Sequence, residues 1–435
     1  MILPHKKWEH RRKEMNEFQK IGRPLAENFF NSVRKESAEG RGVSRQGYGP
    51  HEQYVHDWVI REGKRMGMEI EIDPAGNLWM TRPGKNRDLP AIVSGSHGDS
   101  VPEGGNFDGL AGVVAALTVA QVLDELNVQL ERDYTVLVTR MEESSYFGRA
   151  YVGSLALTGK LKPSEVLLKH RDRDVTLADT IAECGFDPKV MTSGQILKDL
   201  SKIGAFIELH IEQGPRLESS KEARIAAVTG IRGNLRHKVC KVIGETAHSG
   251  AVDREFRHDA VMALAEMLHR MNRHWESWLA AGKDLVFTCG VVNTAPTSAI
   301  AIIPGIVTFG LDMRSLSMDT LYDFHRLMEK ECKSIEEEMG VKFEFDDVLV
   351  CEASGVAPEV LGRIQKAAND HNLPSQSIPS GAGHDAAVLS NAGVPVGMIF
   401  VANQNGSHNW REEMKIDDFM NGAELLWHVV CDFDK

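Results

Sequence analysis

The sequence predicts an α/β protein: a larger domain with a mostly parallel sheet, into which a ferredoxin-like βαββαβ domain is inserted. Two observations lead to this prediction. Between residues 91 and 143, a strand-like apolar run, a helical pattern and a second apolar run follow one another, as in parallel α/β units. Between residues 219 and 350, the patterns follow in the order strand, helix, strand, strand, helix, strand. We therefore expect the larger domain over residues 1–218 and 351–435, and the inserted domain over 219–350.

The larger domain contains several runs that are apolar enough for strands covered on both faces. They are AIVSGSH (91–97), YTVLVTRMEE (134–143), FIELHIEQG (206–214) and VPVGMIFV (394–401). The segment between the first two is rich in small apolar residues at helical spacing. Residues 160–203 are polar and helical in pattern, without an obvious chemical motif.

The inserted domain is expected to contain four strands and two helices. Its strand runs are RHKVCKVIGE (236–245), VFTCGVVNT (286–294), AIAIIPGIVTFGLDMRS (299–315) and KFEFDDVLV (342–350). Its helical runs are DAVMALAEMLHRMNRHWESWLA (259–280) and SMDTLYDFHRLMEKECKSIEEEMG (317–340).

Composition limits the class of protein. The chain has 435 residues, which favours two domains, and a net charge of -12, which argues against a nucleic-acid partner. Six scattered cysteines without a CxxC pair indicate buried thiols in a reducing compartment. The basic N-terminus lacks the apolar segment of a signal peptide, and no window is long enough to span a membrane. We expect a cytoplasmic protein that acts on a small molecule.

Imidazole and carboxylate side chains recur at the predicted strand ends and in nearby loops. They are His97, Asp108, Glu143, His210 and His408. Such donors suit Zn²⁺ or Mn²⁺, and also Co²⁺ or Ni²⁺. Five ligands exceed what one tetrahedral ion needs, so we expect one or two divalent ions per subunit. Two ions about 3.5–4 Å apart would produce hydroxide from water and polarise a carbonyl. This set makes the larger domain the expected catalytic domain.

Two further carboxylates lie beside these ligands. Asp99 is expected to hydrogen-bond a ligand imidazole and fix its tautomer, although a solvated cap on the strand end is the alternative. Glu142 is adjacent to Glu143, and neighbouring carboxylates are costly unless a cation neutralises them or one is protonated. We expect Glu142 to be the general base that takes a proton from water. A pair of surface glutamates is the alternative, and the apolar strand before them argues against it.

The motifs GSHGDSVPEGGNFDG, EESSYFG, ELHIEQGP, GETAHSG, PSGAGHDA and SHN occur in this order. The chain thereby resembles the amidase/hydantoinase-carbamoylase branch of the aminoacylase/carboxypeptidase superfamily of dinuclear metallohydrolases. N-carbamoyl-L-amino acid hydrolases and allantoate amidohydrolases belong to that branch. The resemblance covers roughly residues 40–415.

The resemblance implies roles for individual residues. It makes Asp108 the ligand that bridges two ions and Glu142 the catalytic base. It implies that Gln213 contacts substrate, that Arg314 grips a substrate carboxylate, and that Gly383 and His384 line the pocket. His248 matches a lid histidine that reaches the partner subunit's site and stabilises the oxyanion. The inserted domain would then be a lid and dimerisation domain, and the protein a homodimer.

The chain departs from the family pattern at three places. Ala301 stands where the family has an asparagine that contacts the substrate carboxylate. The lid motif reads HSGAVDR instead of HAGTTPM, and Gly98-Asp99 replaces the usual pair after His97. Neutral drift is one explanation. The other is a substrate unlike the usual ureido acids, with a flatter or more apolar group such as an aromatic ring.

These residues lead us to expect a metal-dependent hydrolase of a non-peptide C–N bond, acting on an N-carbamoyl or ureido group of a small carboxylic acid. The first alternative is hydrolytic deamination of an aromatic amine of the aminobenzoate type. An aminoacylase or dipeptidase is the next alternative. A metal-binding pseudoenzyme is a non-enzymatic alternative, against which the presence of Glu142 argues.

Overall fold

The computed structural model describes residues 5–434, and their side chains from residue 17 on. The chain forms two compact units. The first contains the residues up to Thr229 and those from Gly355 on, and the second runs from Gly230 to Ser354. The second unit thus begins later than residue 219, because β8 (Ile225–Ile231) pairs with β18 of the first unit's sheet.

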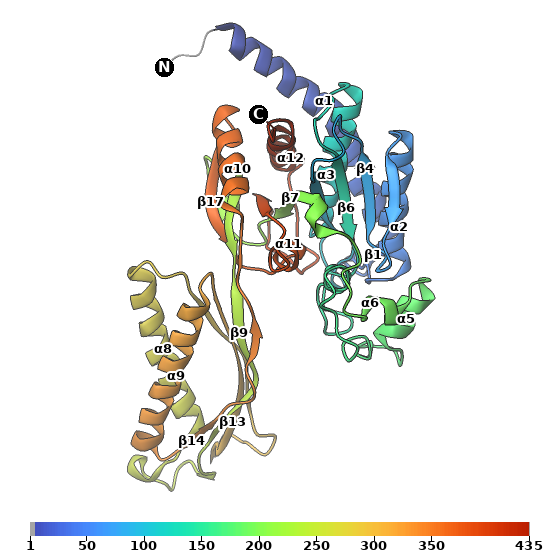
Figure 1. Ribbon diagram of the computed structural model, residues 1–435. Helices are drawn as coiled ribbons and strands as arrows, with labels where there is room; N and C mark the ends of the chain where they lie inside the picture. The colour runs from blue at the N-terminus through green and yellow to red at the C-terminus, as the bar shows by residue number, and fades with distance from the viewer. Residues whose placement is uncertain (1–4, 435) are drawn as a thin grey trace. The chain divides into compact units, whose positions relative to one another are not determined.

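The sheet of the first unit has a parallel centre with antiparallel edges (Figure 1). The strands lie in the order β16-β8-β18-β7-β5-β6-β4-β3, with β17 beside β8. Neighbouring strands are parallel from β18 through β7 and β5 to β6, whereas β4 and β8 pair antiparallel with this centre. The bounds are β3 (Glu69–Ile72), β4 (Leu78–Arg82), β5 (Ala91–His97), β6 (Tyr134–Thr139), β7 (Ile203–Ile211), β16 (Ser354–Gly355), β17 (Ser375–Ser380) and β18 (Val396–Val401). The predicted mixed α/β fold with a mostly parallel central sheet is confirmed.

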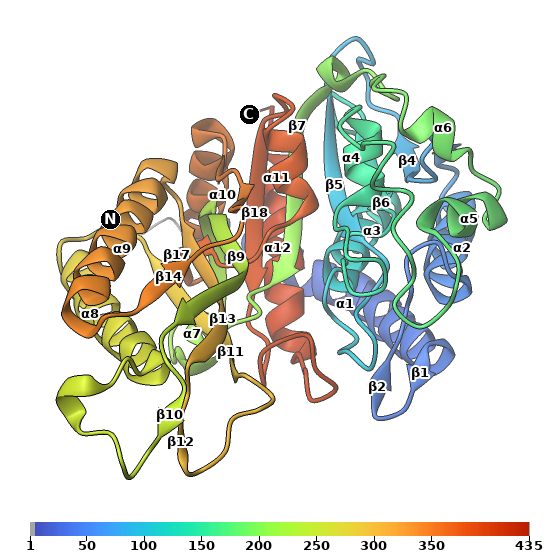
Figure 2. The same ribbon diagram turned by 90° about the horizontal axis from the view of Figure 1, so that it is seen from below.

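Helices cover both faces of this sheet (Figures 1 and 2). One apolar core packs α1 (His5–Glu36), α2 (Pro50–Arg65), α3 (Leu110–Glu125), α10 (Pro358–Asp370) and α12 (Ile416–Cys431) together with the sheet. In β7, Ala205, Ile207 and Leu209 point into this core, so the alternate residues Glu208 and His210 face the other side. Helix α3 consists almost entirely of buried residues, as its run of small apolar side chains predicts.

The segments that follow β6 form much of a second, smaller apolar core in the first unit. It includes Phe147, Leu155 and Leu177. Residues 160–203, expected to be helical, form little regular structure: two short helices, a single 3-10 turn, and the start of β7 at Ile203. The remaining elements of the first unit are β1 (Ala38–Glu39), β2 (Gly42–Val43), α4 (Val152–Leu157), α5 (Leu177–Glu183), α6 (Pro188–Met191), η1 (Leu200–Lys202), α7 (Arg216–Ser219) and α11 (Asp385–Ser390).

The second unit is an antiparallel sheet with two long helices packed against it (Figure 1). The strands lie in the order β11-β13-β9-β14, with β15 also beside β9. Helix α9 begins at the N-cap Ser317, whose hydroxyl accepts from Thr320 N–H, and ends at Gly340, which adopts a left-handed φ of 64°. The bounds are β9 (Gly233–Ile243), β10 (Ala247–His248), η2 (Arg254–Phe256), α8 (Ala260–Ala280), β11 (Val286–Thr294), β12 (Ile302–Ile303), β13 (Ile306–Ser315), α9 (Met318–Met339), β14 (Lys342–Glu344) and β15 (Leu349–Cys351).

Cys240 and Cys332 are buried in the core of the second unit, but Cys351 is exposed, so burial does not describe every thiol. Among the described residues, none of the helices is both long and apolar enough to cross a bilayer.

Candidate metal centre

The carboxylate of Asp108 belongs to two groups of potential metal ligands in the first unit. On one side is the buried triad of His97, Asp108 and His210, and on the other is the open triad of Asp108, Glu143 and His408. Nε2 of His97 and Nε2 of His210 lie 3.6 Å and 3.2 Å from Oδ1 of Asp108. Nε2 of His408 lies 3.4 Å from Oδ2 of Asp108 and 3.2 Å from Oε1 of Glu143. Each Asp108 oxygen therefore faces its own triad.

The sheet topology explains why these residues meet. His97 ends β5 and His210 lies near the end of β7, while Glu143 follows β6; these are neighbouring parallel strands. Their carboxyl ends share one edge of the sheet, where open α/β folds place their sites. Asp108 is returned to this edge by a loop that ends at Gly109. That glycine has a φ of +66°, and a Cβ atom there would lie 2.3 Å from the His97 ring.

The imidazoles of the buried triad are oriented as metal ligands usually are. Nδ1 of His97 lies 3.2 Å from Oδ1 of Asp99, and Nδ1 of His210 lies 2.9 Å from the carbonyl oxygen of Ile211. These contacts occupy Nδ1 and leave Nε2 of each ring directed toward Asp108, where it would bind an ion. Nε2 of His210 also lies 3.2 Å from the backbone nitrogen of Gly109.

The charges of this site fit bound cations. Three carboxylates, Asp108, Glu142 and Glu143, are each largely buried within a few ångströms of the histidines. Burial opposes the ionised form of Asp108, but bonds with His210 and His408 outweigh it and hold its pKa well below the usual value. Hydrogen bonds to Asp108 and then Glu143 raise the pKa of His408 to about 11. Divalent ions would displace these imidazole protons and neutralise the carboxylates in their place.

Asp99 connects the buried triad to Glu142 and Glu143. Besides its contact with His97, its Oδ1 accepts from Glu142 N–H and its Oδ2 from Glu143 N–H, both at 3.0 Å. Oε2 of Glu142 then lies 3.9 Å from Nε2 of His97. Burial raises the pKa of Glu142 well above the usual value, and Glu143 and Asp385 add to the rise while His97 opposes it. A raised pKa suits a carboxylate that must accept and return a proton.

Gln213 and Ser407 both contact the outer oxygen of Asp108. Nε2 of Gln213 donates to Oδ2 of Asp108 at 2.8 Å, and the Ser407 hydroxyl donates to the same oxygen. Gln213 adopts a left-handed φ of 62° and its N–H donates to the Asn403 side chain. Oε1 of Gln213 is buried and makes no hydrogen bond within the described residues. Buried polar atoms are normally hydrogen-bonded, so this oxygen is open to a further polar group, and the substrate contact expected of Gln213 stays a prediction.

His384 lies beside the buried triad, and Gly383 precedes it in the chain. The His384 ring packs edge-on against His210 at 4.5 Å, and its Nε2 lies 2.8 Å from the Ser380 hydroxyl. A Cβ atom on Gly383 would lie 1.9 Å from the Tyr151 hydroxyl, so only glycine allows this approach.

Two buried residues that the sequence analysis did not identify shape the loop between His97 and Asp108. Arg45 is fully buried; it donates to the carbonyl of Gly98 at 2.9 Å and to the Asn106 side chain at 3.2 Å. Burial lowers its pKa to about 10, although nearby carboxylates, Glu412 first, oppose this. Oε1 of Glu412 accepts from the N–H groups of Phe107 and Asp108.

Three predicted site residues lie in the second unit. His248 is exposed in β10, and its Nδ1 accepts from Gly250 N–H. Ala301 precedes β12, the partner of β10, and its carbonyl accepts from Ser249 N–H at 2.9 Å. Arg314 in β13 forms an ion pair with Asp312 at 2.7 Å. The roles given to these residues stay predictions.

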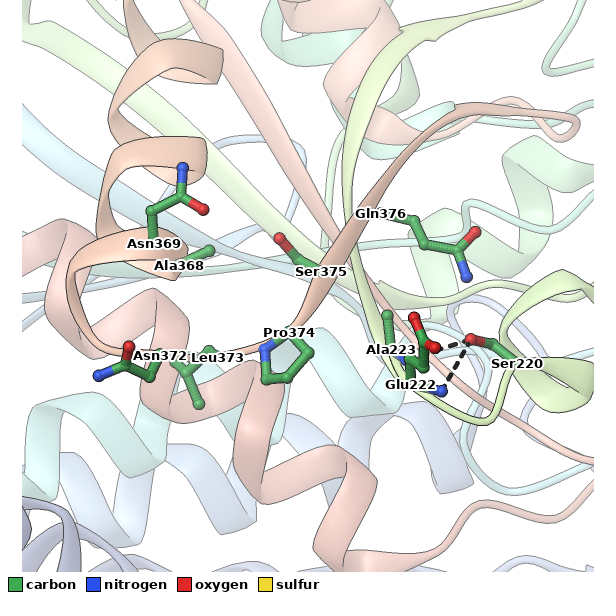
Figure 3. Close-up of a pocket in the computed structure, with 10 residues that line it drawn as sticks. All are labelled: Ser220, Glu222, Ala223, Ala368, Asn369, Asn372, Leu373, Pro374, Ser375 and Gln376. Carbon is green, nitrogen blue, oxygen red and sulfur yellow. Dashed lines mark hydrogen bonds between the residues drawn. The ribbon is translucent and has the colours of Figure 1, made fainter.

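The first unit also has a surface hollow of about 610 Å³ between residues 220–223 and 368–376 (Figure 3). Glu222 is its only ionisable lining residue, and the lining includes neither histidine nor cysteine. The hollow contains none of the predicted site residues.

Imidazole and carboxylate side chains gathered at the carboxyl edge of a parallel α/β sheet are the arrangement expected of a metal-dependent hydrolase. The model of Peptidase family M20/M25/M40 matches residues 93–432, and the chain belongs to this family. It is 32% identical over 421 residues to an N-carbamoyl-L-amino-acid amidohydrolase of Paenarthrobacter aurescens, which covers 96% of this chain and 99% of that protein. It is 30% identical to the allantoate amidohydrolase of Escherichia coli (strain K12), over 88% of this chain and 91% of that protein.

Solved structures give the same assignment. An amidase of the hydantoinase/carbamoylase family from Burkholderia multivorans superposes with a TM-score of 0.85 at 28% identity, covering 94% of this chain and 97% of the other. The resemblance to the hydantoinase/carbamoylase branch is therefore confirmed, and the chain is an enzyme of the amidohydrolase type.

Proposed function

We propose that the chain hydrolyses the N-carbamoyl or ureido group of a small carboxylic acid to an amine, CO₂ and ammonia. The observation that carries the proposal is the shared carboxylate of Asp108, with one oxygen facing each triad and Glu142 beside the buried one. The names of the amidohydrolase relatives support the substrate class.

The residues of the two triads would hold two divalent ions, Mn²⁺ or Zn²⁺ by the chemistry of the donors. Bound there, such ions lower the pKa of water and polarise a carbonyl oxygen. Glu142 takes a proton from the attacking water and passes it to the departing nitrogen. One water is consumed for each ureido group, and its hydrogens end on the two nitrogens while its oxygen ends in CO₂.

We further propose that the second unit is a ferredoxin-like lid and dimerisation domain of a homodimer. In this proposal His248 stabilises the oxyanion in the partner's site, and Arg314 leaves Asp312 to bind the substrate carboxylate through its bidentate fork. Mixing inactive His248→Ala with inactive Glu142→Gln protein tests the exchange. Restored turnover in the mixture supports action across subunits, and an inactive mixture from subunits shown to exchange contradicts it.

The experiment for the reaction measures ammonia and CO₂ together. Mn²⁺-reconstituted protein is supplied with N-carbamoyl-L-amino acids, allantoate, aminobenzoates and N-acyl amino acids. Equal release of ammonia and CO₂ supports the proposal. Glu142→Gln should lower kcat by about 10²–10⁴-fold while both ions stay bound, because only the proton transfer is lost. Unchanged turnover in this variant would contradict the role of Glu142 as base.

One observation favours a second candidate. Ala301 is exposed, and its methyl side chain offers no hydrogen bond to a substrate. A substrate read at this position by apolar contact, such as an aromatic amine, fits it better than a polar ureido acid. Release of ammonia without CO₂ from aminobenzoates would support hydrolytic deamination. Turnover of N-acyl amino acids without ammonia would instead indicate an aminoacylase.

A further inference from the structure

The N–H groups of the turn that carries Glu142 and Glu143 are bound by side chains rather than by the sheet. Strand β6 ends at Thr139, and the next four N–H groups all donate to side-chain oxygens. The acceptors are Oδ1 of Asn77 for residue 140, Oε1 of Glu52 for residue 141, and the two carboxylate oxygens of Asp99 for residues 142 and 143. These bonds are between 2.8 and 3.0 Å long. Three separate parts of the chain therefore hold the N–H groups of these four residues. The carbonyl oxygens of residues 140, 141 and 142 accept from backbone N–H groups of residues 153, 152 and 151.

The turn contains an unfavourable backbone conformation directly before the proposed base. Met141 has a φ of 47°, a left-handed value that non-glycine residues rarely adopt. Such a conformation persists only where the surroundings impose it, and it is common at functional sites. Gly47 packs against this residue so closely that a Cβ atom there would lie 2.4 Å from Cβ of Met141. The side chain of Met141 is itself buried.

Glu52 of α2 is the acceptor that holds Met141. Its side chain is fully buried, and its Oε1 accepts from Met141 N–H at 2.8 Å. Its Oε2 accepts from Tyr48 N–H at 2.7 Å and from Nη1 of Arg140 at 2.8 Å. Tyr48 is also left-handed, with a φ of 56°. One carboxylate thus fixes two left-handed residues and pairs with the arginine at the start of the turn.

We propose that Glu52 is a positioning residue of the reaction, acting through Met141 on the placement of the Glu142 and Glu143 carboxylates. Asp99 holds the turn from the side of the histidines, and Glu52 holds it from the opposite end. A buried ion pair such as that between Glu52 and Arg140 adds little to stability compared with apolar residues. Its value here is geometric, because a displacement of about 1 Å at a catalytic group costs on the order of 10² in rate. The inference rests on the proposed function in its assignment of Glu142 as base.

The test compares Glu52→Gln with Val59→Ala. Glutamine keeps the size of the side chain but has one acceptor oxygen, so it can hold Met141 N–H or the pair of Tyr48 and Arg140, not both. Val59 is fully buried in the apolar core on the same helix and serves as a matched destabilising control. In Glu52→Gln we expect kcat to fall about 10- to 100-fold with KM within about threefold. Val59→Ala should lower Tm with kcat unchanged.

Two readouts do not depend on turnover. Hydrogen exchange in a peptide spanning residues 138–146 should become faster in Glu52→Gln than in wild type or in Val59→Ala. The affinity for the second Mn²⁺ should fall in Glu52→Gln, because Glu143 lies in the same turn. Unchanged exchange and Mn²⁺ affinity in Glu52→Gln, or changes equal to those of Val59→Ala, would overturn the positioning role. Activity retained in Glu142→Gln would instead overturn the proposed function, and the exchange and Mn²⁺ results would still decide whether Glu52 holds the turn.

Discussion

The buried triad and the open triad share Asp108 but differ in solvent exposure and in the hydrogen bonds that the Asp108 oxygen facing each of them accepts. The side chains of His97 and His210 are 2% and 1% exposed, whereas that of His408 is 52% exposed. Oδ1 of Asp108 faces the two oriented imidazoles, while Oδ2 also accepts from Gln213 and Ser407. An ion in the open triad must therefore compete with two hydrogen bonds and with water. One carboxylate can thus serve two sites of unequal strength.

The backbone adds to this difference. His97 and His210 belong to central strands of the sheet, whereas His408 lies in the loop after β18 with a left-handed φ of 58°. Ligands on strands are held more precisely than ligands on loops. We therefore expect the buried triad to be preorganised and the open triad to complete its geometry as the ion binds.

The largest effect is expected from removing the charge that both triads share. Asp108→Asn keeps the shape of the side chain but not its anionic bridge. Mn²⁺ affinity should fall by more than about 100-fold, because even outer partners of a metal site account for 10- to 100-fold. Metal stoichiometry by elemental analysis after gel filtration, together with turnover, checks this. A variant that retains two ions would contradict the bridging role, and its circular dichroism spectrum establishes that it is folded.

A smaller effect separates the two triads. His408→Ala should release one ion per subunit and leave the other bound, whereas His210→Ala should lose the tightly held ion. In wild type, titration with a chelator should remove the ions in two steps, and the weaker step should be absent in His408→Ala. Simultaneous loss of both ions in wild type and in His408→Ala would show that the two triads bind their ions with equal strength.

That the residues of both triads lie together could be predicted from the sequence, because each lies at a recognisable strand end or motif. His97 and Glu143 come directly after apolar runs, and parallel strands bring their carboxyl ends to one edge. The central strands of the sheet were predictable for the same reason, since buried parallel strands are continuously apolar.

Glu52, Arg45 and Glu412 could not be found in this way. Each binds backbone groups of a segment distant along the chain, as Glu412 does with Phe107 and Asp108, about 300 positions away. A side chain that bonds to N–H or carbonyl groups requires no particular residue type in its partner, so it leaves no paired signal in the sequence. The start of the second unit was misplaced for a related reason, because the pairing of β8 with β18 is non-local.

The smallest effect is expected at His56, a buried histidine outside both triads. His97 is buried like His56, but Glu142 and Asp99 outweigh its burial and raise its pKa well above the usual value. His56 has an Nε2 that makes no hydrogen bond within the described residues, and burial, with a smaller effect of Arg140, holds its pKa well below 6.5. Below about pH 6.5 the unfolded chain therefore binds a proton at His56 that the folded chain does not bind. The contribution of the neutral His56 to the free energy of unfolding is present above that pH and is lost as the pH falls.

His56→Phe removes this titration and should make the first unit less sensitive to acid. The difference in unfolding free energy between the variant and wild type should shift in favour of the variant by about 1.4 kcal/mol for each pH unit below 6.5. Urea titrations at pH 7.5 and 5.5 with excess chelator measure it, since metal binding depends on pH in its own right. His51→Phe on the same helix is the matched control. A difference in unfolding free energy between His56→Phe and wild type that does not change with pH would mean that the His56 ring is protonated in the folded protein. Burial without a carboxylate partner would then not lower the pKa of a histidine in this fold.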